Sequence, residues 1–198
     1  MILKELTDSS KLFFTSDLHF NHFNIISFAK RPFKTEEYMN EGIIKRFNNK
    51  VPEDGTTYIL GDLYVSTKNP ELLSSWIRRL NGKKHLILGN HDYFDRDYYL
   101  DYCGFESVTQ YLEIAVGKQI IVMSHYPMMS WNHINHNAWM LYGHVHGTFN
   151  RVEELIRSNI YPINPWVGSK TMDVGIDNNV NLEPFSFNEI SKIMDKLQ

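Results

Sequence analysis

The sequence predicts an α/β sandwich rather than a helical bundle or an all-β fold. Short apolar runs alternate along the chain with amphipathic stretches that have the residue spacing of helices. Polar residues and glycines directly follow most of the apolar runs, as expected where strands end in functional loops. No internal repeat, low-complexity tract or Pro/Gly/Ser-rich linker divides the chain, so residues 1–198 are expected to form one domain.

Short apolar segments that end in turn residues are predicted to be strands. They lie at residues 11–16, 57–60, 85–88, 111–116, 119–124, 139–142 and 171–174. Gly117-Lys118, between two of these segments, is typical of a hairpin turn. Residues 147–170 show no such pattern, and we expect an irregular loop there with a short helix at 152–157.

Three amphipathic segments are predicted to be helices. The first spans residues 35–48, where Met39, Ile43 and Phe47 are spaced four apart and share one face. The second begins at Asn69-Pro70, with the asparagine as the cap and the proline in the first turn.

The third predicted helix lies near the C-terminus. Ser186 and Glu189 have the spacing of a capping box that begins this helix. Its apolar face would include Ile190 and either Ile193 or Met194.

The composition is that of an ordinary globular protein, with 42% hydrophobic and 22% charged residues, and it excludes a disordered or fibrous chain. The net charge of −3 gives no overall attraction for nucleic acid or for an anionic membrane. The one cysteine, Cys103, cannot form an internal disulfide, which favours a reducing compartment. No segment has the pattern of a signal peptide or a membrane span, so we expect a cytoplasmic protein without membrane contact.

Polar residues that can bind metal recur at the C-terminal ends of five predicted strands. In an open α/β sheet the loops at these strand ends converge on one crevice, so the residues can meet despite their separation in sequence. Glycines stand beside most of them, and glycine lets a chain turn sharply and pass close to an ion. The residues are Asp17 and His19, Asp62, Asn90 with His91 and Asp92, His125, and His144 with His146.

Each of these motifs has a structural alternative when it is considered alone. An Asp-x-His pair, or a Gly-Asp after a strand, consists of ordinary turn residues. The Gly-His-Val-His-Gly segment at residues 143–147 is more specific, because alternate side chains of an extended segment point the same way. The complete set, in this order along the chain, is hard to attribute to chance and predicts a metal site.

The motifs resemble the five-block signature of the calcineurin-like metallophosphoesterases. The resemblance extends over residues 13–147, and the segment DVGIDNNVNLEPFSFNEI also resembles the ending of small bacterial and phage members. It implies a four-layer αββα sandwich of two mixed β-sheets flanked by helices. It further implies two ligand sets, Asp17, His19, Asp62 and His146 for one ion, and Asp62, Asn90, His125 and His144 for the other.

The chemistry implied by the resemblance is hydrolysis of a phosphate ester. Two divalent ions about 3.5–4 Å apart can clamp a phosphoryl group and provide a nucleophilic hydroxide. Ligands of this type favour Mn²⁺, Fe²⁺, Zn²⁺, Ni²⁺ or Co²⁺ over Cu⁺, and the resemblance makes Mn²⁺ the first choice. His91 would protonate the leaving oxygen or neutralise its charge, and Asp92 would orient the His91 imidazole.

Three further residues are candidates for binding substrate. His22 and Asn24 follow the first motif, and Arg31 could hold a phosphate through two hydrogen bonds. For each of them the alternative is a solvated or packing side chain.

The expected substrate is a small phosphorylated molecule, and nucleotide derivatives are among the candidates. A phosphodiester is favoured because the predicted site loops contain few cations and a diester phosphate carries one negative charge. A phosphomonoesterase or a nuclease using the same ions is the alternative, and a non-catalytic binding scaffold is the alternative from another class. No motif indicates an obligatory protein partner, and the oligomeric state is left open.

Overall fold

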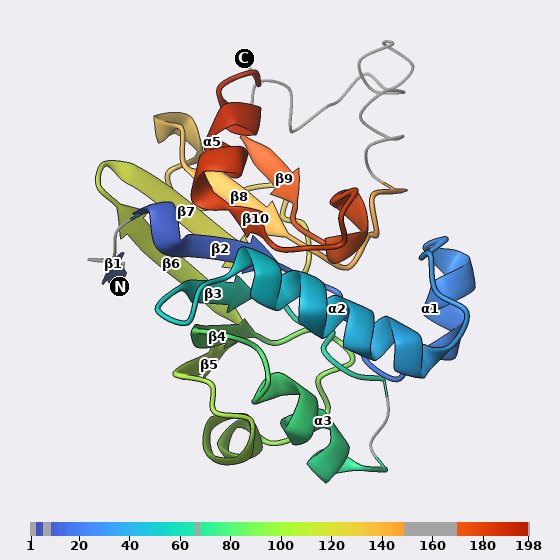
Figure 1. Cartoon of the computed structure of the whole chain (residues 1–198). Helices are drawn as coiled ribbons and strands as arrows, with labels where there is room; N and C mark the ends of the chain where they lie inside the picture. The colour runs from blue at the N-terminus through green and yellow to red at the C-terminus, as the bar shows by residue number, and fades with distance from the viewer. Residues whose placement is uncertain (1–2, 6–8, 66–67, 149–169, 198) are drawn as a thin grey trace.

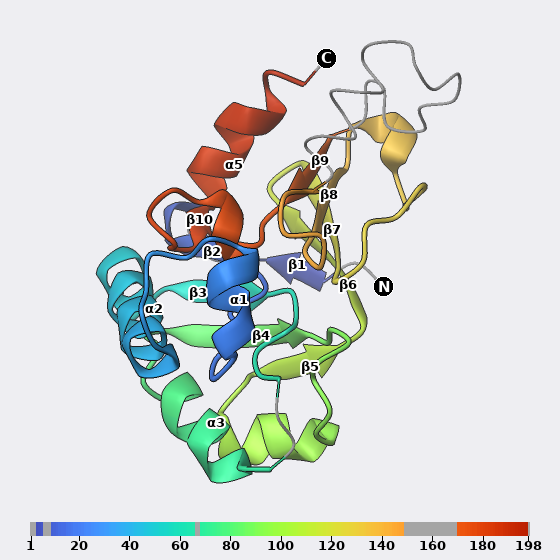
Figure 2. The same cartoon turned by 90° about the vertical axis from the view of Figure 1, so that its right-hand side faces the viewer.

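The computed structural model describes residues 3–5, 9–65, 68–148 and 170–197, and its framework is a pair of five-stranded sheets (Figures 1 and 2). The first sheet has the order β1-β6-β7-β8-β9, with strands Leu3–Glu5, Tyr111–Val116, Gln119–Ser124, Trp139–Tyr142 and Thr171–Asp173. The second has the order β10-β2-β3-β4-β5, with strands Phe185–Ser186, Leu12–Thr15, Thr56–Ile59, Lys83–Ile87 and Ser107–Thr109. In each sheet one pair of neighbours is antiparallel, β6 with β7 and β10 with β2, so both sheets are mixed.

All seven predicted strands are present, with ends that differ by at most a residue or two. The predicted hairpin joins β6 to β7, and Gly117 at its turn has the left-handed φ of 61° that glycine tolerates. Three strands were not predicted, namely β1, β5 and β10. Each has only two or three residues and is defined by its pairing with a neighbour.

One core lies between the two sheets, and alternating side chains build it. Leu12 and Phe14 of β2 contact this core together with Ile121 and Met123 of β7. Phe13, between the first two, belongs instead to the core beneath the helices. This alternation is the two-residue period of a strand that is buried on both faces.

Helices flank this framework, as predicted. The α-helices are α1 (Phe23–Phe28), α2 (Glu36–Lys50), α3 (Pro70–Ile77) and α5 (Phe187–Met194). Helices α2 and α3 cover the outer face of the second sheet (Figure 2), where the predicted apolar face of α2 is buried. Short helical turns lie at Ser9–Lys11, Tyr98–Tyr102, Ile134–His136 and Ile176–Asn178.

Helix α5 lies beside β9 and β10, and it adds Ile190 and Met194 to the core between the sheets (Figure 1). Of the two alternatives predicted for its apolar face, Met194 is buried and Ile193 is exposed. The capping box of Ser186 and Glu189 is present as predicted.

The other two predicted helix starts differ in their capping. Thr35 caps α2 by accepting a hydrogen bond from the Tyr38 N–H. Asn69 is the N-cap residue of α3, but its side chain makes no capping bond, so that part of the prediction is wrong. Pro70 does occupy the first turn, and its fixed φ favours the start of a helix without a side-chain cap.

The outer face of the first sheet is covered, in the described part of the chain, by the segment after β7. Trp131 and Ala138 of this segment pack on Val122 and Met140. The helix expected at residues 152–157, and nearly all of the loop expected over 147–170, lie outside the described residues. Among the described residues, no helix is long and apolar enough to cross a membrane.

Candidate metal centre

The predicted ligands lie together where strands of both sheets end. His19 and Asp17 follow β2, and Asp62 follows β3 of the second sheet, whereas His125 follows β7 of the first. Two compact groups result, Asp17 with His19 and His146, and Asp62 with His125 and His144. Within each group the possible ligand atoms lie within 4.8 Å of one another. Each group therefore takes residues from both sheets.

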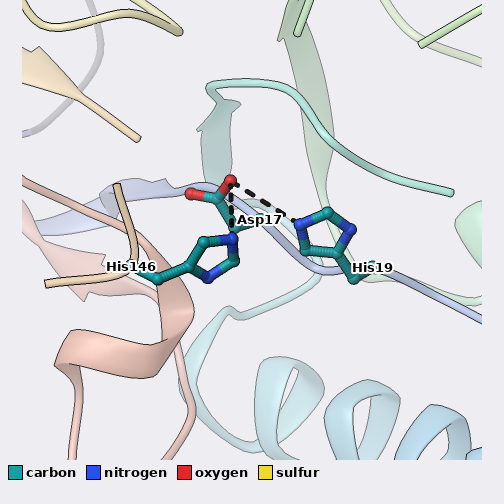
Figure 3. A group of neighbouring side chains, drawn as sticks. All are labelled: Asp17, His19 and His146. Carbon is teal, nitrogen blue, oxygen red and sulfur yellow. Dashed lines mark ion pairs between the residues drawn. The ribbon is translucent and has the colours of Figure 1, made fainter. Parts of the chain in front are cut away.

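The first cluster, defined as Asp17, His19 and His146, is arranged around one carboxylate oxygen (Figure 3). The Nε2 atoms of His19 and His146 each lie 3.9 Å from Asp17 Oδ1. These distances are too long for hydrogen bonds and leave space for an ion between the atoms. Both ring nitrogens of His19 are buried and have no hydrogen-bond partner among the described residues. Such orphaned nitrogens fit a bound cation.

The second cluster, defined as Asp62, His125 and His144, is held by the backbone behind it. His125 Nδ1 lies 2.7 Å from the carbonyl oxygen of Leu60, which can only accept, so Nδ1 carries the proton. His125 Nε2 then presents a lone pair, 3.5 Å from Asp62 Oδ1 and 3.0 Å from Asn90 Oδ1. Acceptors that converge in this way repel each other unless a cation lies among them.

Asp62, a member of the second cluster, also faces the first. Its Oδ2 is 3.6 Å from His19 Nε2, and its Oδ1 is 3.5 Å from His125 Nε2. A carboxylate with one oxygen toward each cluster has the placement that a bridging ligand requires.

Burial determines the charge state of the site. It raises the pKa of Asp17 to about 7, and the nearby carboxylates of Asp62 and Asp173 add to this effect. Burial also lowers the pKa values of His19 and His125, so both rings are neutral, which is the form that binds metal. Burial acts against the charge of His146, but its hydrogen bond to Asp177 and the charge of Asp17 raise its pKa.

Five of the seven candidate ligands have a left-handed backbone. Their φ values are 59° for Asp17, 51° for His19, 57° for Asp62, 71° for His144 and 46° for His146. For a residue with a Cβ atom this conformation costs about 1–2 kcal/mol. Strain of this kind, gathered at one place, is a frequent property of functional sites.

Two glycines allow the loops to approach one another. A Cβ atom on Gly143 would collide with Ser16 Oγ and would lie 2.6 Å from Asp17 Oδ2. A Cβ atom on Gly89 would collide with Asp62 Oδ1. The sequence prediction that glycine permits close approach therefore holds at these two positions, where the close neighbours are candidate ligands.

His91 lies beside the clusters without joining either of them. Its ring centroid is 5.5 Å from that of His19, and its backbone N–H donates to Asp62 Oδ1 at 2.9 Å. Its Nδ1 is 2.8 Å from the hydroxyl oxygen of Tyr93. The ring is therefore oriented by Tyr93, a partner that the sequence analysis did not identify.

The role predicted for Asp92 is wrong. Its carboxylate does not orient the His91 ring but accepts three backbone N–H groups, from Gly89 at 2.8 Å, Asp62 at 2.9 Å and Leu63 at 3.0 Å. These bonds fix the loops that follow β3 and β4. Four residues separate Asp92 from the end of β4, so its carboxylate can fold back onto the Gly89 N–H and also reach the two N–H donors in the loop after β3.

A cavity of about 540 Å³ opens over the clusters. It is lined by His19, His22, Ile25, Phe28, Ala29, Asp62, Asn90, His91, His144, Val145, His146 and Thr148. His22 lines the cavity, and its contact with substrate stays a prediction, whereas Asn24 is exposed on α1 and is not part of the lining. Within the described part of the chain, the lining contains no lysine or arginine.

Arg31 does not reach the cavity, and its predicted role as a phosphate ligand is wrong. Its side chain is fully buried. The guanidinium donates to the Asp177 carboxylate at 2.7 and 2.9 Å, and to the carbonyl oxygens of Asp17 at 2.7 Å and Leu18 at 2.8 Å. A group with these partners has no free face for a substrate.

Two further carboxylates support the site and were missed in the sequence. Asp177 accepts a hydrogen bond from His146 Nδ1 at 2.8 Å. Asp173 accepts one from the backbone N–H of Gly147 at 2.8 Å. Both lie in the segment DVGIDNN, where an acidic residue among turn-forming residues gives no signal of its distant partner.

Both the sequence and the fold are similar to those of known proteins. A family model described as "Calcineurin-like phosphoesterase" matches residues 10–158. An uncharacterized protein of Methanocaldococcus jannaschii is 32% identical over 188 residues, covering 94% of this chain and 92% of the relative. The "Gene 66 protein" of Mycobacterium phage L5 is 29% identical over 178 residues, covering 77% of this chain and 85% of the relative. A crystal structure of a protein of unknown function from Aquifex aeolicus shares the fold, with a TM-score of 0.67, 24% identity and coverage of 92% and 98%.

Proposed function

Because this chain belongs to the calcineurin-like phosphoesterase family, we propose that it hydrolyses phosphodiesters with two divalent metal ions held at the paired clusters. The observation that carries the proposal is the placement of Asp62, which directs one carboxylate oxygen toward each cluster. One buried carboxylate facing two sets of histidine nitrogens is difficult to explain without cations.

The residues divide into two sets of four ligands that share Asp62. One ion would be held by Asp17, His19, Asp62 and His146, and the other by Asp62, Asn90, His125 and His144. Carboxylate, imidazole and amide donors without a thiolate suit Mn²⁺, our first choice, as well as Fe²⁺, Zn²⁺, Ni²⁺ and Co²⁺.

When bound, the ions would supply Lewis acidity at the phosphoryl oxygens and would lower the pKa of the attacking water. The proton donor in our proposal is His91, which lines the cavity and contacts Asp62 only through its backbone. Since the Tyr93 hydroxyl occupies Nδ1, the Nε2 atom is the one that can protonate a leaving oxygen. His22, on the same cavity wall, is our candidate for contact with a phosphate oxygen.

The preference for a diester rests on charge. A phosphate monoester is close to dianionic at neutral pH, and proteins usually surround such a group with cationic side chains. The described cavity lining contains no lysine or arginine, and the one arginine predicted to serve is buried against Asp177. A diester carries one negative charge, which two metal ions can balance. Ile25, Phe28 and Ala29 form an apolar wall suited to an organic ester group.

The test is a paired assay with Mn²⁺, using an aryl phosphodiester and the monoester of the same alcohol. We expect the higher kcat/KM for the diester. A preference for the monoester by tenfold or more, about 1.4 kcal/mol in the transition state, would instead assign a phosphomonoesterase. Cleavage of single-stranded nucleic acid in preference to both esters would assign a nuclease, and no turnover of any substrate by metal-loaded protein would assign a binding scaffold. A cytoplasmic location and one domain over residues 1–198 stay predictions.

A further inference from the structure

The buried guanidinium of Arg31 joins three segments that surround the first cluster. Its hydrogen bonds to the carbonyl oxygens of Asp17 and Leu18 hold the loop that carries two of the three cluster residues. Its other two hydrogen bonds hold the carboxylate of Asp177, which lies 146 positions away in the sequence. Arg31 thus fixes the first metal-binding loop and a distant carboxylate with one rigid group.

Asp177 in turn orients the third member of the cluster. Its Oδ2 lies 2.8 Å from His146 Nδ1, and because an ionised carboxylate can only accept, Nδ1 carries the proton. Both oxygens of Asp177 also accept hydrogen bonds from the Arg31 guanidinium, at 2.7 and 2.9 Å, which is the pairing of an ionised carboxylate. The lone pair of His146 is therefore on Nε2, the atom that lies 3.9 Å from Asp17 Oδ1 (Figure 3).

We propose that Arg31 and Asp177 are positioning residues that set the metal affinity of the first cluster and leave that of the second largely unchanged. The inference rests on the proposed function, since it requires that the clusters bind ions. Arg31 acts on the loop of Asp17 and His19, and Asp177 acts on the ring of His146. Partners of this kind fix the tautomer and the direction of a ligand, and their loss typically weakens metal binding about 10–100-fold.

The selectivity rests on supports that the second cluster has of its own. The two clusters also touch, because the His19 N–H donates to the carbonyl oxygen of Asp62 at 2.9 Å and the His144 N–H donates to the Asp17 carboxylate at 3.0 Å, so a smaller effect on the second ion is expected. His125 is oriented by the carbonyl oxygen of Leu60, and the loop of Asp62 is held by the Asp92 carboxylate. Neither contact involves Arg31 or Asp177. A purely structural ion pair would instead stabilise the fold without distinguishing between two ions.

The experiment is a titration of metal-free protein with Mn²⁺. Binding is measured by calorimetry and by the electron paramagnetic resonance signal of the free ion. Wild type is expected to bind two ions per chain. Asp177→Asn keeps the shape of the side chain and removes its charge. It is expected to lower the affinity for one ion about 10–100-fold and the affinity for the other by less than about threefold. Arg31→Lys is expected to weaken the binding of the same ion, because an ammonium cannot reproduce the four hydrogen bonds that the guanidinium donates to oxygen atoms.

The matched control is Glu189→Gln, the same change of acid to amide in another ion pair, between Glu189 and Lys50, which joins α5 to α2. It is expected to bind both ions as wild type does. Circular dichroism checks that each variant is folded. If Asp177→Asn does not fold, the metal titration of Arg31→Lys tests the inference. Native affinity for both ions in a folded variant, or equal weakening of both, would overturn the inference. Failure of wild-type protein to bind any ion would overturn the proposed function instead.

Discussion

Replacing His91 with asparagine is expected to separate proton donation from metal binding. The backbone N–H of residue 91, not its ring, donates to Asp62 Oδ1, so the substitution keeps this contact with the bridging carboxylate. The side chain is only half-buried, so the stability of the fold is expected to change by about 0.5 kcal/mol or less. Metal content should therefore be that of wild type.

The loss of activity is expected to depend on the leaving group. A positioned general acid contributes about 10²–10⁴ in rate, which corresponds to about 2.7–5.4 kcal/mol at 1.36 kcal/mol per tenfold. We expect a loss in this range for a diester with a poor alkoxide leaving group. A nitrophenolate leaves with little need for a proton, so the loss for a nitrophenyl diester should be smaller by at least tenfold.

The assay compares kcat/KM for the two diesters in wild-type and His91→Asn protein, with metal content measured on the same samples. Tyr93→Phe is the matched control, since it removes only the hydroxyl that contacts His91 Nδ1, and its effect should be smaller for both esters. Equal losses for the two esters, or loss of an ion from His91→Asn, would refute the assignment of His91 as the acid.

Three further predictions follow from the site. Asp62→Ala is expected to weaken the binding of both ions, because one oxygen of this carboxylate faces His19 of the first cluster and the other faces His125 of the second. Two ions retained at native affinity in a metal titration would contradict the bridging role. Since burial raises the pKa of Asp17 to about 7, a proton competes with the metal below that pH, and the apparent affinity for Mn²⁺ should fall by at least about tenfold between pH 7 and pH 5. Calorimetry that finds the same affinity at pH 5 and pH 7 would exclude this competition. Gly143→Ala is expected to destabilise the metal-free protein by about 1–3 kcal/mol, because the new Cβ collides with Ser16 Oγ, and an unchanged midpoint of urea unfolding would argue against the collision.

The strands and helices that the sequence predicts are those in which local pattern and packing agree. Residues 12–14 of β2 alternate between two cores, and residues 139–142 of β8 do the same, so a run of apolar residues there is sufficient to identify a strand. Strands β1 and β10 are strands only because β6 and β2 pair with them, and two or three residues carry no period of their own.

The same distinction applies to the site. Residues with ligand chemistry at strand ends were identified from sequence, because each has a local signal in its motif. Arg31 has a local signal too, next to a proline in a loop near the first motif, but its partner Asp177 is 146 positions away. Only the fold brings the two together, and their pairing changes Arg31 from a candidate phosphate ligand into a buried support. Asp92 was assigned to the wrong partner because its backbone donors come from two different loops.

The division of each cluster between the two sheets has a consequence for how the molecule opens. His146 follows a strand of the first sheet, whereas Asp17 and His19 follow a strand of the second, so one ion would be a cross-link between the layers. Asp62 and His125 make the second cluster a cross-link of the same kind. Bound metal would then hold the two sheets together at the edge where these strands end, because the sheets could separate there only after the ions had left. Hydrogen exchange of backbone amides in β2 and β7, which line the interface between the sheets, would slow together on metal binding.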